Sequence, residues 1–523
     1  MQRIEALKMG YRQNVSLVGP RFIGKSFLLS HFLNSLRQDS EVVPLYILLI
    51  ETDFDGLLER WLGALLQGYL FWKGIPVPDE FQLLVKTSRQ YIPKTLERMR
   101  GVKKFAFQKK TTLAFRELLN LTATLSEETG KKILLVLDEF QYLGSLELAD
   151  PFGLFGKEMM IQKNTLYLAT SSEPQKIAEI FNNRLSLLFG NFEVIEVPPL
   201  KAEALRTWLL TQYPKLQIPE TDIRVLNHLL NNHPYYFDLF LRALHLHKEE
   251  AAQNGWSREL MMRVLKESLF SNCGLLNRHF EFEIQNLLRI SHPIRPYVNT
   301  LLAVAHGRVK LPQIVAYAGK KGLETKKNLQ RLVKEGMLQK KGSFYFLPDP
   351  LFRFWLKNVY QVKDREFHPS GGKTQASFEI RLEREVRKIE EEDQKDLTAR
   401  LEALFREFRN DVVEMGRKKV KCPSFLELAS RPTNGRYFPM LGRTSQGRWF
   451  CQVFRDTVTE SDVAGFSEEL KRYRRNIARR VMVTLGGIDL NAKLMAQEGK
   501  IQIWDLENLN MLLDLYGQRK VLL

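Results

Sequence analysis

One eight-residue segment near the start of the chain limits most strongly what this chain can fold into. Residues 19–26 have the spacing G-x-x-x-x-G-K-S, in which the glycines let main-chain N–H groups turn inward around phosphates. An apolar run from Val15 to Val18 precedes this loop, and apolar residues at helical spacing follow it as far as Leu36. Strand, loop and helix in this order predict a P-loop that binds ATP at the positive end of the helix. The alternative interpretation is a glycine turn without a ligand.

The predicted nucleotide contacts are the loop residues and the start of the helix. They are Gly19, Pro20, Arg21, Phe22, Ile23, Gly24, Lys25, Ser26 and Phe27. We expect Lys25 to take part in catalysis by reaching the β- and γ-phosphates, and the Ser26 hydroxyl to bind Mg²⁺.

Three further apolar runs read as buried strands, at residues 44–50, 132–137 and 165–169. The second ends in two carboxylates: Asp138 is expected to hold Mg²⁺ through water, and Glu139 to orient and deprotonate the attacking water. The third ends in small hydroxyl residues, of which Ser171 is predicted to sense the γ-phosphate. Acidic pairs and small polar residues also end many ordinary strands. The alternation of strands and helices predicts an α/β fold with an AAA-like P-loop NTPase core.

Length and composition favour a soluble, multidomain protein. The 523 residues predict three or four domains, and no apolar run is long enough to span a bilayer. The three cysteines lack metal-ligand spacing, which indicates inert thiols in a reducing compartment. We therefore expect a cytoplasmic protein without membrane contact.

The formal charge of +18 is concentrated in one segment. Residues 291–360 contain 13 basic and three acidic residues. Such an excess favours a polyanionic partner, although a solvated basic face would produce the same count.

Four segments carry a family resemblance: residues 19–26, 133–143, 166–172 and 193–200. They resemble the archaeal-type ATPase family of the STAND branch of AAA-like P-loop NTPases. The resemblance implies a helical lid in which Pro234 contacts the nucleotide, and an arginine that completes the site, commonly from a neighbouring copy in a homo-oligomer. Asn191 stands where many members have that arginine, and Arg184 is the nearest substitute.

Residues 291–360 predict a winged helix, which the family also carries. Three amphipathic helices are followed by an alternating hairpin over residues 336–347. The third helix, residues 325–335, directs basic side chains outward at Lys326, Lys327, Arg331 and Lys334. Because third helices of such modules grip duplexes, these residues predict binding to double-stranded DNA. A plain protein-interaction module is the alternative.

The C-terminal part predicts two helices, at 378–391 and 397–415, and then short strands. Its order resembles the restriction-endonuclease-like fold of family relatives. Such nucleases need an acidic residue on the second strand and E-x-K or D-x-K on the third. Here the third strand has Gln452 and Phe454 instead, so we expect an inactive module with a basic docking helix at 471–480. Asp456 and Glu460 could supply a displaced metal site.

The predicted domains are an ATPase core (1–200), a helical lid (201–290), a winged helix (291–360), a charged helical linker (361–420) and an inactive nuclease-like domain (421–523). Together they predict an ATP-hydrolysing, DNA-associated switch with an unknown protein partner. The alternatives are an ATP-gated nuclease or effector, and a scaffold that binds ATP without turnover.

Overall fold

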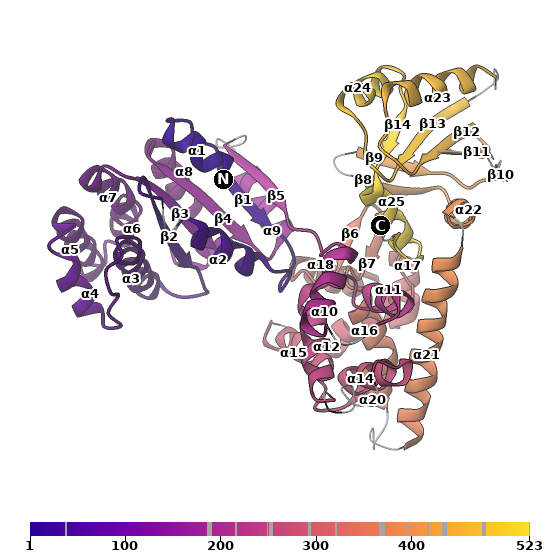
Figure 1. The fold of residues 1–523 in the computed structure, drawn as a ribbon, viewed down its shortest axis with the longest axis horizontal. Coiled ribbons are helices and arrows are strands. Elements are labelled where there is room, and N and C mark those ends of the chain that lie inside the picture. The colour runs from indigo at the N-terminus through magenta and orange to yellow at the C-terminus, as the bar shows by residue number, and fades with distance from the viewer. Residues whose placement is uncertain are drawn as a thin grey trace. The chain divides into compact units, whose positions relative to one another are not determined.

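A five-stranded parallel sheet forms the centre of the first of two units, Met1–Pro199 and Leu200–Leu523, into which the chain divides (Figure 1). The computed structural model describes residues 1–36, 39–185, 191–214, 217–247, 249, 255–290, 294–319, 322–365, 372–395, 397–415, 418–430, 437–472 and 477–521. Over these ranges no helix combines the length and apolar character needed to cross a membrane.

The sheet of the first unit has the order β2-β3-β4-β1-β5, and every pairing is parallel. Its strands are β1 (Asn14–Val18), β2 (Val42–Leu48), β3 (Lys132–Asp138), β4 (Thr165–Ser171) and β5 (Phe192–Glu196). The three inner strands are buried almost throughout, because helices cover both faces of the sheet. The predicted α/β core is confirmed.

The helices of this unit are α1 (Gln2–Lys8), α2 (Lys25–Ser35), α3 (Phe54–Trp72), α4 (Phe81–Ser88), α5 (Pro93–Phe107), α6 (Thr111–Leu119), α7 (Leu121–Thr129), α8 (Pro151–Ile161) and α9 (Pro174–Glu179), with short helical segments η1 (Phe140–Ser145) and η2 (Ile180–Arg184). The large core between α3, α5, α6 and α8 and the sheet is mainly aliphatic, and within it the ring of Phe155 contacts those of Phe140 and Tyr167, all three fully buried.

The second unit begins with helices that share one hydrophobic core. They are α10 (Ala202–Gln212), α11 (Glu220–Leu229), α12 (Pro234–His245), α14 (Arg258–Phe270), α15 (Leu275–Ile290), α16 (Arg295–Ala305), α17 (Leu311–Ala318), α18 (Gly322–Lys334), α19 (Pro350–Trp355), η4 (Leu356–Tyr360) and α21 (Gly372–Gln394). The short helix α20 (Gln361–Arg365) follows η4. The hairpin of β6 (Gln339–Lys341) and β7 (Phe344–Phe346) follows α18. Three helices and a hairpin therefore occur over residues 295–346, as the periodicity predicts.

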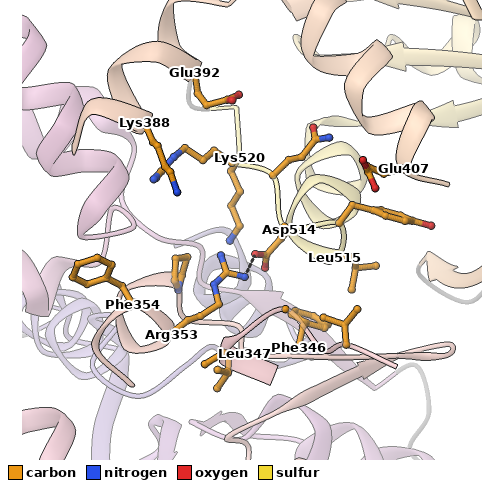
Figure 2. A pocket seen from close by; sticks show the side chains of 18 of the residues that line it. Phe346, Leu347, Arg353, Phe354, Lys388, Glu392, Glu407, Asp514, Leu515 and Lys520 are labelled. Carbon is orange, nitrogen blue, oxygen red and sulfur yellow. Dashed lines mark hydrogen bonds and ion pairs between the residues drawn. The ribbon is translucent and has the colours of Figure 1, made fainter. Parts of the chain in front are cut away.

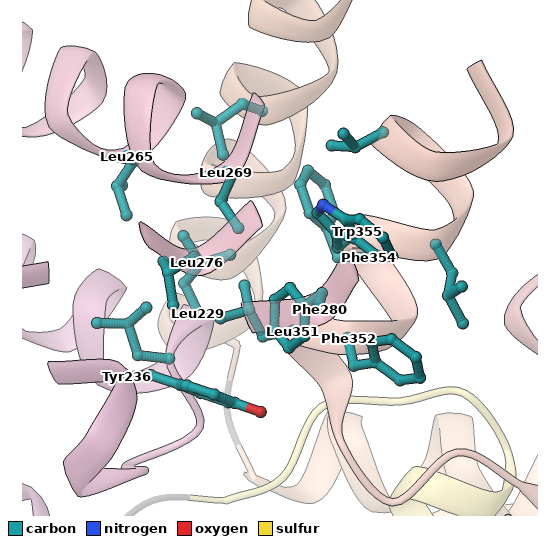
Figure 3. Close-up of a cluster of buried hydrophobic side chains, with 14 of the residues drawn as sticks. Leu229, Tyr236, Leu265, Leu269, Leu276, Phe280, Leu351, Phe352, Phe354 and Trp355 are labelled. Carbon is teal, nitrogen blue, oxygen red and sulfur yellow. The ribbon is translucent and has the colours of Figure 1, made fainter. Parts of the chain in front are cut away.

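Aromatic packing joins the lid segment to the segment after the hairpin (Figure 3). Phe280 of α15 lies 5.5 Å from Trp355 of α19 and 5.5 Å from Tyr236 of α12, between ring centroids. The Tyr236 hydroxyl donates a hydrogen bond to Asp349, whose carboxylate also accepts from the main-chain N–H groups of Leu351 and Phe352 and so caps α19. Burial raises the pKa of Asp349. The lid and the following helices thus form one packed body.

The segment predicted as a charged linker contributes to this core. Phe378, Leu382, Val386 and Ile389 are buried on one face of α21, at helical spacing. The helix predicted over residues 397–415 is wrong in its second half, because α22 (Leu397–Glu407) ends and β8 (Asp411–Met415) pairs with β9 (Lys418–Cys422). Val413 and Met415 are buried in alternation with exposed or half-exposed neighbours, which is a strand pattern.

A second five-stranded sheet, of order β10-β11-β12-β13-β14, forms the centre of the C-terminal module, and α22 and the hairpin β8–β9 share its core and are counted with it. Its elements are β10 (Glu427–Ser430), β11 (Tyr437–Thr444), β12 (Gly447–Phe454), α23 (Glu460–Arg472), β13 (Ile477–Thr484), α24 (Leu490–Glu498), β14 (Gln502–Trp504) and α25 (Leu506–Leu515). The first three strands are antiparallel and the last two pairings are parallel. The basic helix predicted over 471–480 is wrong from residue 477, where β13 begins, and residues 473–476 lie outside the described residues.

Two of the three cysteines are buried in this module. Burial raises the pKa of Cys422 and of Cys451 to about 12, so both thiols stay protonated near neutral pH. Cys273 is exposed. This agrees with the expectation of inert thiols at the two buried positions.

The hairpin β6–β7 packs against the C-terminal module. Phe344 and Phe346 belong to the core formed by α22, β8 and α25, and Phe344 lies 5.4 Å from Tyr516 between ring centroids. Lys310 pairs with Asp411 at 2.5 Å across the same junction. At Gly342 the approach is so close that an added Cβ would lie 2.1 Å from the carbonyl oxygen of Val412.

We predict that Gly342→Ala lowers the thermal unfolding midpoint more than Gly336→Ala does. Both glycines have positive φ, +65° and +75°, so each alanine is strained by about 1 kcal/mol. Only Gly342 faces a neighbouring main chain, whose displacement should cost roughly 1–3 kcal/mol more. Equal midpoints for the two variants, measured by circular dichroism, would show that the hairpin does not depend on this close approach.

Candidate nucleotide-binding site

The P-loop geometry depends on two glycines. Gly24, at φ +99°, ends the loop and begins α2, a conformation that side chains other than glycine rarely adopt. A Cβ at Gly19 would lie 3.1 Å from the carbonyl oxygen of Val197, which follows β5. Phe22 also has positive φ, at 62°. The loop is thus tightly wound against the edge of the sheet.

The predicted contacts differ in exposure to solvent. Gly19, Ile23 and Lys25 are buried, Gly24 is half-buried, and the exposed group is Pro20, Arg21, Phe22, Ser26 and Phe27.

Lys25 is a buried cation that main-chain carbonyls hold in place. Its side chain belongs to a residue that is 4% exposed, and its Nζ donates to the main-chain carbonyls of Gly19 and Pro20, both at 2.9 Å. In the described part of the chain, no carboxylate lies within ion-pair distance of Lys25. Burial lowers its pKa, against the opposing effect of Glu139 and Asp138. A cation held this way at the N-terminus of an 11-residue helix fits a triphosphate.

Asp138 is the last residue of β3, and its carboxylate accepts hydrogen bonds from hydroxyl groups of three other elements. It accepts hydrogen bonds from Tyr46 of β2 at 2.6 Å, from Ser26 of α2 at 3.3 Å, and from Thr170 of β4. Burial, and then the hydrogen bond to Asp138, raise the pKa of Tyr46 well above its usual value, so Tyr46 remains a donor. Ser26 and Asp138, the predicted Mg²⁺ pair, therefore lie together, and hydroxyl and carboxylate oxygens are donors that Mg²⁺ accepts.

Glu139 has a main-chain conformation that is costly for a glutamate. Its φ of 57° and ψ of 50° are left-handed, and such strain concentrates at functional positions. Its carboxylate accepts from the Ser172 hydroxyl at 2.7 Å, the Ser172 N–H at 3.1 Å and the Gln141 amide at 2.5 Å. Glu139 is thus held by neutral donors beside Asp138.

Of the three hydroxyl residues at the end of β4, Thr170 and Ser172 reach the acidic pair. The Ser171 hydroxyl instead accepts from the main-chain N–H of Glu173 at 3.0 Å. Neighbouring residues of a strand point to opposite faces, which places 170 and 172 together and 171 apart. The alternation of side chains along a strand could have separated Ser171 from Thr170 and Ser172 at the level of the sequence. No local sequence pattern indicates that Tyr46 and Gln141 contact the acidic pair. The role of Ser171 as a γ-phosphate sensor stays a prediction.

Two further groups predicted to contact the nucleotide are Pro234 and an arginine. Pro234 is the first residue of α12, in the second unit, where His233 stacks on Tyr236 at 4.3 Å between ring centroids. Arg184 ends η2, and residues 186–190 lie outside the described residues. The arginine that the resemblance implies is therefore still a prediction.

The basic residues predicted to bind DNA share the outer face of α18. Lys326, Lys327 and Lys334 are exposed, whereas Leu329 and Leu332 are buried in the core of the second unit. Arg331 is partly exposed and forms an ion pair with Glu335 at 3.0 Å.

The third strand of the C-terminal module lacks the donors that a metal-dependent nuclease requires. Gln452 and Phe454 are buried on the face of β12 that is covered by α23 and α24, and Gln452 donates its amide to Glu469 of α23. Pro439 of β11 lies opposite Gln452. Within the described ranges, no group of three or more His, Cys, Asp or Glu residues could hold a metal ion.

The sheet order and the strand, P-loop and helix unit define the α/β fold of AAA-like P-loop NTPases. No family model and no curated protein sequence matches this chain.

Solved structures with similarity include a Walker-type ATPase of Pyrococcus abyssi, at 20% identity and a TM-score of 0.47 over 68% of this chain and 93% of the other. The ORC2 protein of Aeropyrum pernix is 13% identical, with a TM-score of 0.42 over 70% and 92%. The ORC1 protein of the same organism, in complex with DNA, is 14% identical, with a TM-score of 0.37 over 68% and 89%. At this level of similarity, function has to be derived from the site residues themselves.

Proposed function

We propose that the chain is an ATP-binding and ATP-hydrolysing switch. The observation that supports this best is the convergence of three features at one edge of the first sheet: the buried ammonium of Lys25, held by main-chain carbonyls, the Mg²⁺-compatible pair Ser26 and Asp138, and the strained Glu139. These groups come from α2, β3 and the turn after β3, and hydroxyls from β2 and the end of β4 hold the carboxylates.

Each of these residues has a distinct role. The main-chain N–H groups of the loop and Lys25 bind the phosphates, and Ser26 and Asp138 hold Mg²⁺. Bound Mg²⁺ neutralises charge that develops on the β- and γ-phosphates. Glu139 orients water and accepts its proton, for which its carboxylate has to exchange at least one of its hydrogen bonds to Ser172 and Gln141 for a bond to water.

The predicted test of hydrolysis uses two variants. Glu139→Gln should bind ATP with Mg²⁺ and turn it over at least about a hundredfold more slowly, because a positioned base is removed. Lys25→Ala should lose the part of the thermal stabilisation by ATP that the P-loop supplies, which for an intact site is about 2.7 kcal/mol at a hundred times Kd. Phosphate release and thermal shift measure the two effects.

Glu147→Gln is the matched control, since Glu147 is an exposed carboxylate of the same unit. It should leave binding and turnover unchanged. Undiminished turnover in Glu139→Gln would refute the assignment of the base, and binding without turnover in the unaltered chain would favour the scaffold alternative.

We further propose that α18 binds double-stranded DNA. The support is its exposed basic face together with the position of the hairpin, whose Phe344 and Phe346 are buried in the C-terminal module. Because these side chains are engaged there, α18 is the element of the proposed winged helix that is left to contact a duplex. An interaction module for a protein partner is the alternative.

Neutralising Lys326, Lys327, Arg331 and Lys334 to Gln should weaken duplex binding and reduce its salt dependence by roughly one unit of slope for each phosphate that is no longer neutralised. A matched control neutralises three lysines and one arginine that are exposed in the first unit, Lys94, Arg100, Lys104 and Lys110. Fluorescence anisotropy at several salt concentrations measures both effects. Equal effects of the two variants would show that only net charge matters.

We also propose that the C-terminal module is a nuclease-like fold without nuclease activity. Gln452 is neutral and donates its amide to Glu469, and the side chain of Phe454 has no polar atom. At these two positions β12 therefore has no negative charge to bind a metal ion and no group to orient a water molecule. The module then serves for docking. A homo-oligomer in which a neighbouring copy supplies an arginine, and a separate protein partner, stay predictions from the family resemblance.

The unaltered chain should leave linear, branched and single-stranded DNA intact during incubation with ATP and either Mg²⁺ or Mn²⁺, because the metal ligands are missing. Gel electrophoresis of end-labelled DNA detects cleavage. Cleavage that Asp456→Ala abolishes would instead establish the displaced site and the ATP-gated nuclease alternative.

A further inference from the structure

A cavity of about 1190 Å³ is lined by residues of the second unit (Figure 2). Its walls come from five parts of the chain: the end of α11, the end of α16 with the hairpin, α19 and η4, the last turns of α21, one face of α22, and the segment 514–520 at the end of α25. Figure 2 shows Arg353, Lys388, Asp514 and Lys520 around the same open space. Segments that are distant in sequence thus bring charged side chains together.

Most of the acidic residues that line this cavity are already neutralised by a basic neighbour. The pairs are Asp514 with Arg353 at 3.4 Å, Glu385 with Arg519 at 2.6 Å, Asp411 with Lys310 at 2.5 Å, Glu392 with Lys395 at 2.5 Å, and Glu407 with Arg409 at 3.9 Å. Among the described residues, Glu391 is the lining carboxylate without such a partner.

Four lining bases remain after this pairing. The guanidinium of Arg400 donates to the main-chain carbonyls of Arg519 and Lys520, at 2.5 Å and 3.2 Å. For Lys357, Lys388 and Lys520, the part of the chain that the structure describes offers no carboxylate within ion-pair distance. The cavity therefore contains an uncompensated positive charge of about three, in a space where cations repel one another.

His228, which also lines the cavity, is affected by this positive field. Burial is the main cause that lowers its pKa to about 4, and the nearby guanidinium of Arg519 lowers it further, with smaller effects of Arg400 and Arg224 in the same direction. Asp393 acts in the opposite direction. The imidazole stays neutral near pH 7 and adds a hydrogen-bonding group rather than charge.

We propose that this cavity binds a compact polyphosphate group, whether free or attached to a nucleoside, through Lys357, Lys388 and Lys520 with Arg353 at its base. Lys357 and Lys388 are exposed and Lys520 is partly exposed, and all three line one open cavity, which favours a compact anion over a continuous nucleic-acid strand. The volume of about 1190 Å³ lies somewhat above the ~300–1,000 Å³ that small-molecule sites usually have, so a ligand with several phosphate groups can be accommodated. The site is independent of the P-loop and of the proposed ATP hydrolysis.

Binding at this position would connect three elements at once. Lys388 belongs to α21, Lys357 to η4 and Lys520 to the segment after α25. A polyphosphate that binds all three would hold the C-terminal module against the helices before it, in addition to the packing of the hairpin. The ligand would therefore stabilise the second unit against unfolding.

The test uses inorganic tripolyphosphate and ATP as separate probes, and Lys25→Ala as the background chain, so that the P-loop does not contribute. Calorimetric titration should detect tripolyphosphate binding to this chain. Replacing Lys357, Lys388 and Lys520 by Gln should weaken that binding at least about a hundredfold, because three charge-assisted hydrogen bonds to the phosphates are removed. ATP that binds more tightly than tripolyphosphate would identify a nucleoside polyphosphate as the ligand.

The matched control replaces Lys201, Lys493 and Lys500 by Gln, three exposed lysines of the same unit that do not line the cavity; this removes the same charge and should leave tripolyphosphate binding unchanged. Single Lys388→Gln, at an exposed position, repeats the test should the triple variant unfold, and should weaken binding about tenfold.

Absence of binding to the Lys25→Ala chain, or equal weakening in the two triple variants, would overturn the proposal. It would also be overturned if the cavity variant no longer bound a 12-nucleotide single strand and kept tripolyphosphate binding. Failure of these titrations leaves the effect of ATP on the P-loop chain untouched, so the two proposals fail separately.

Discussion

The parallel register of β1, β3 and β4 is the constraint on which the candidate nucleotide site depends. Val18 lies opposite Ser171, and Leu137 lies opposite Ala169, so the residues that follow these strands meet at one edge. A shift of one residue would turn Asp138 away from Thr170 and Glu139 away from Ser172. Strand pairing therefore brings the residues of the site together. The P-loop places Lys25 and Ser26 near the acidic pair because β1 lies between β4 and β5.

The groups that the sequence identifies are those with a local signal. Gly24 and Lys25 have fixed spacing, and Asp138 follows an apolar run, so each can be assigned without knowledge of the fold. Tyr46 cannot, because it lies 92 residues from Asp138 and meets it only after β2 and β3 pair. Composition does not distinguish Ser171 from its hydroxyl-bearing neighbours; the alternation of β4 does, and it separates Ser171 from the acidic pair.

The difference between a local signal and a contact between distant segments also explains the second unit. The periodicity of the sequence predicts the helices and the hairpin over residues 295–346, but it does not predict which parts of the chain they pack against. Phe344 and Phe346 are apolar residues whose burial depends on a module more than fifty residues further along the chain. The error after Glu407 has a different cause: charged residues at helical spacing continue past the end of α22, and only the alternation of Val413 and Met415 marks the start of β8.

The count of basic residues in the sequence overstates how many basic side chains are available to bind a nucleic acid in the folded chain. Of the basic residues in segment 291–360, Lys310 pairs with Asp411, Arg353 with Asp514 and Arg331 with Glu335. Two of these three acidic partners belong to the C-terminal module, so the folded chain neutralises part of the excess with residues that a local count leaves out. What remains is divided between the exposed face of α18 and the cavity that Lys357 lines. An exposed helix face suits an extended duplex and a concave cavity suits a small anion, so one charge excess is compatible with both of the proposed binding sites.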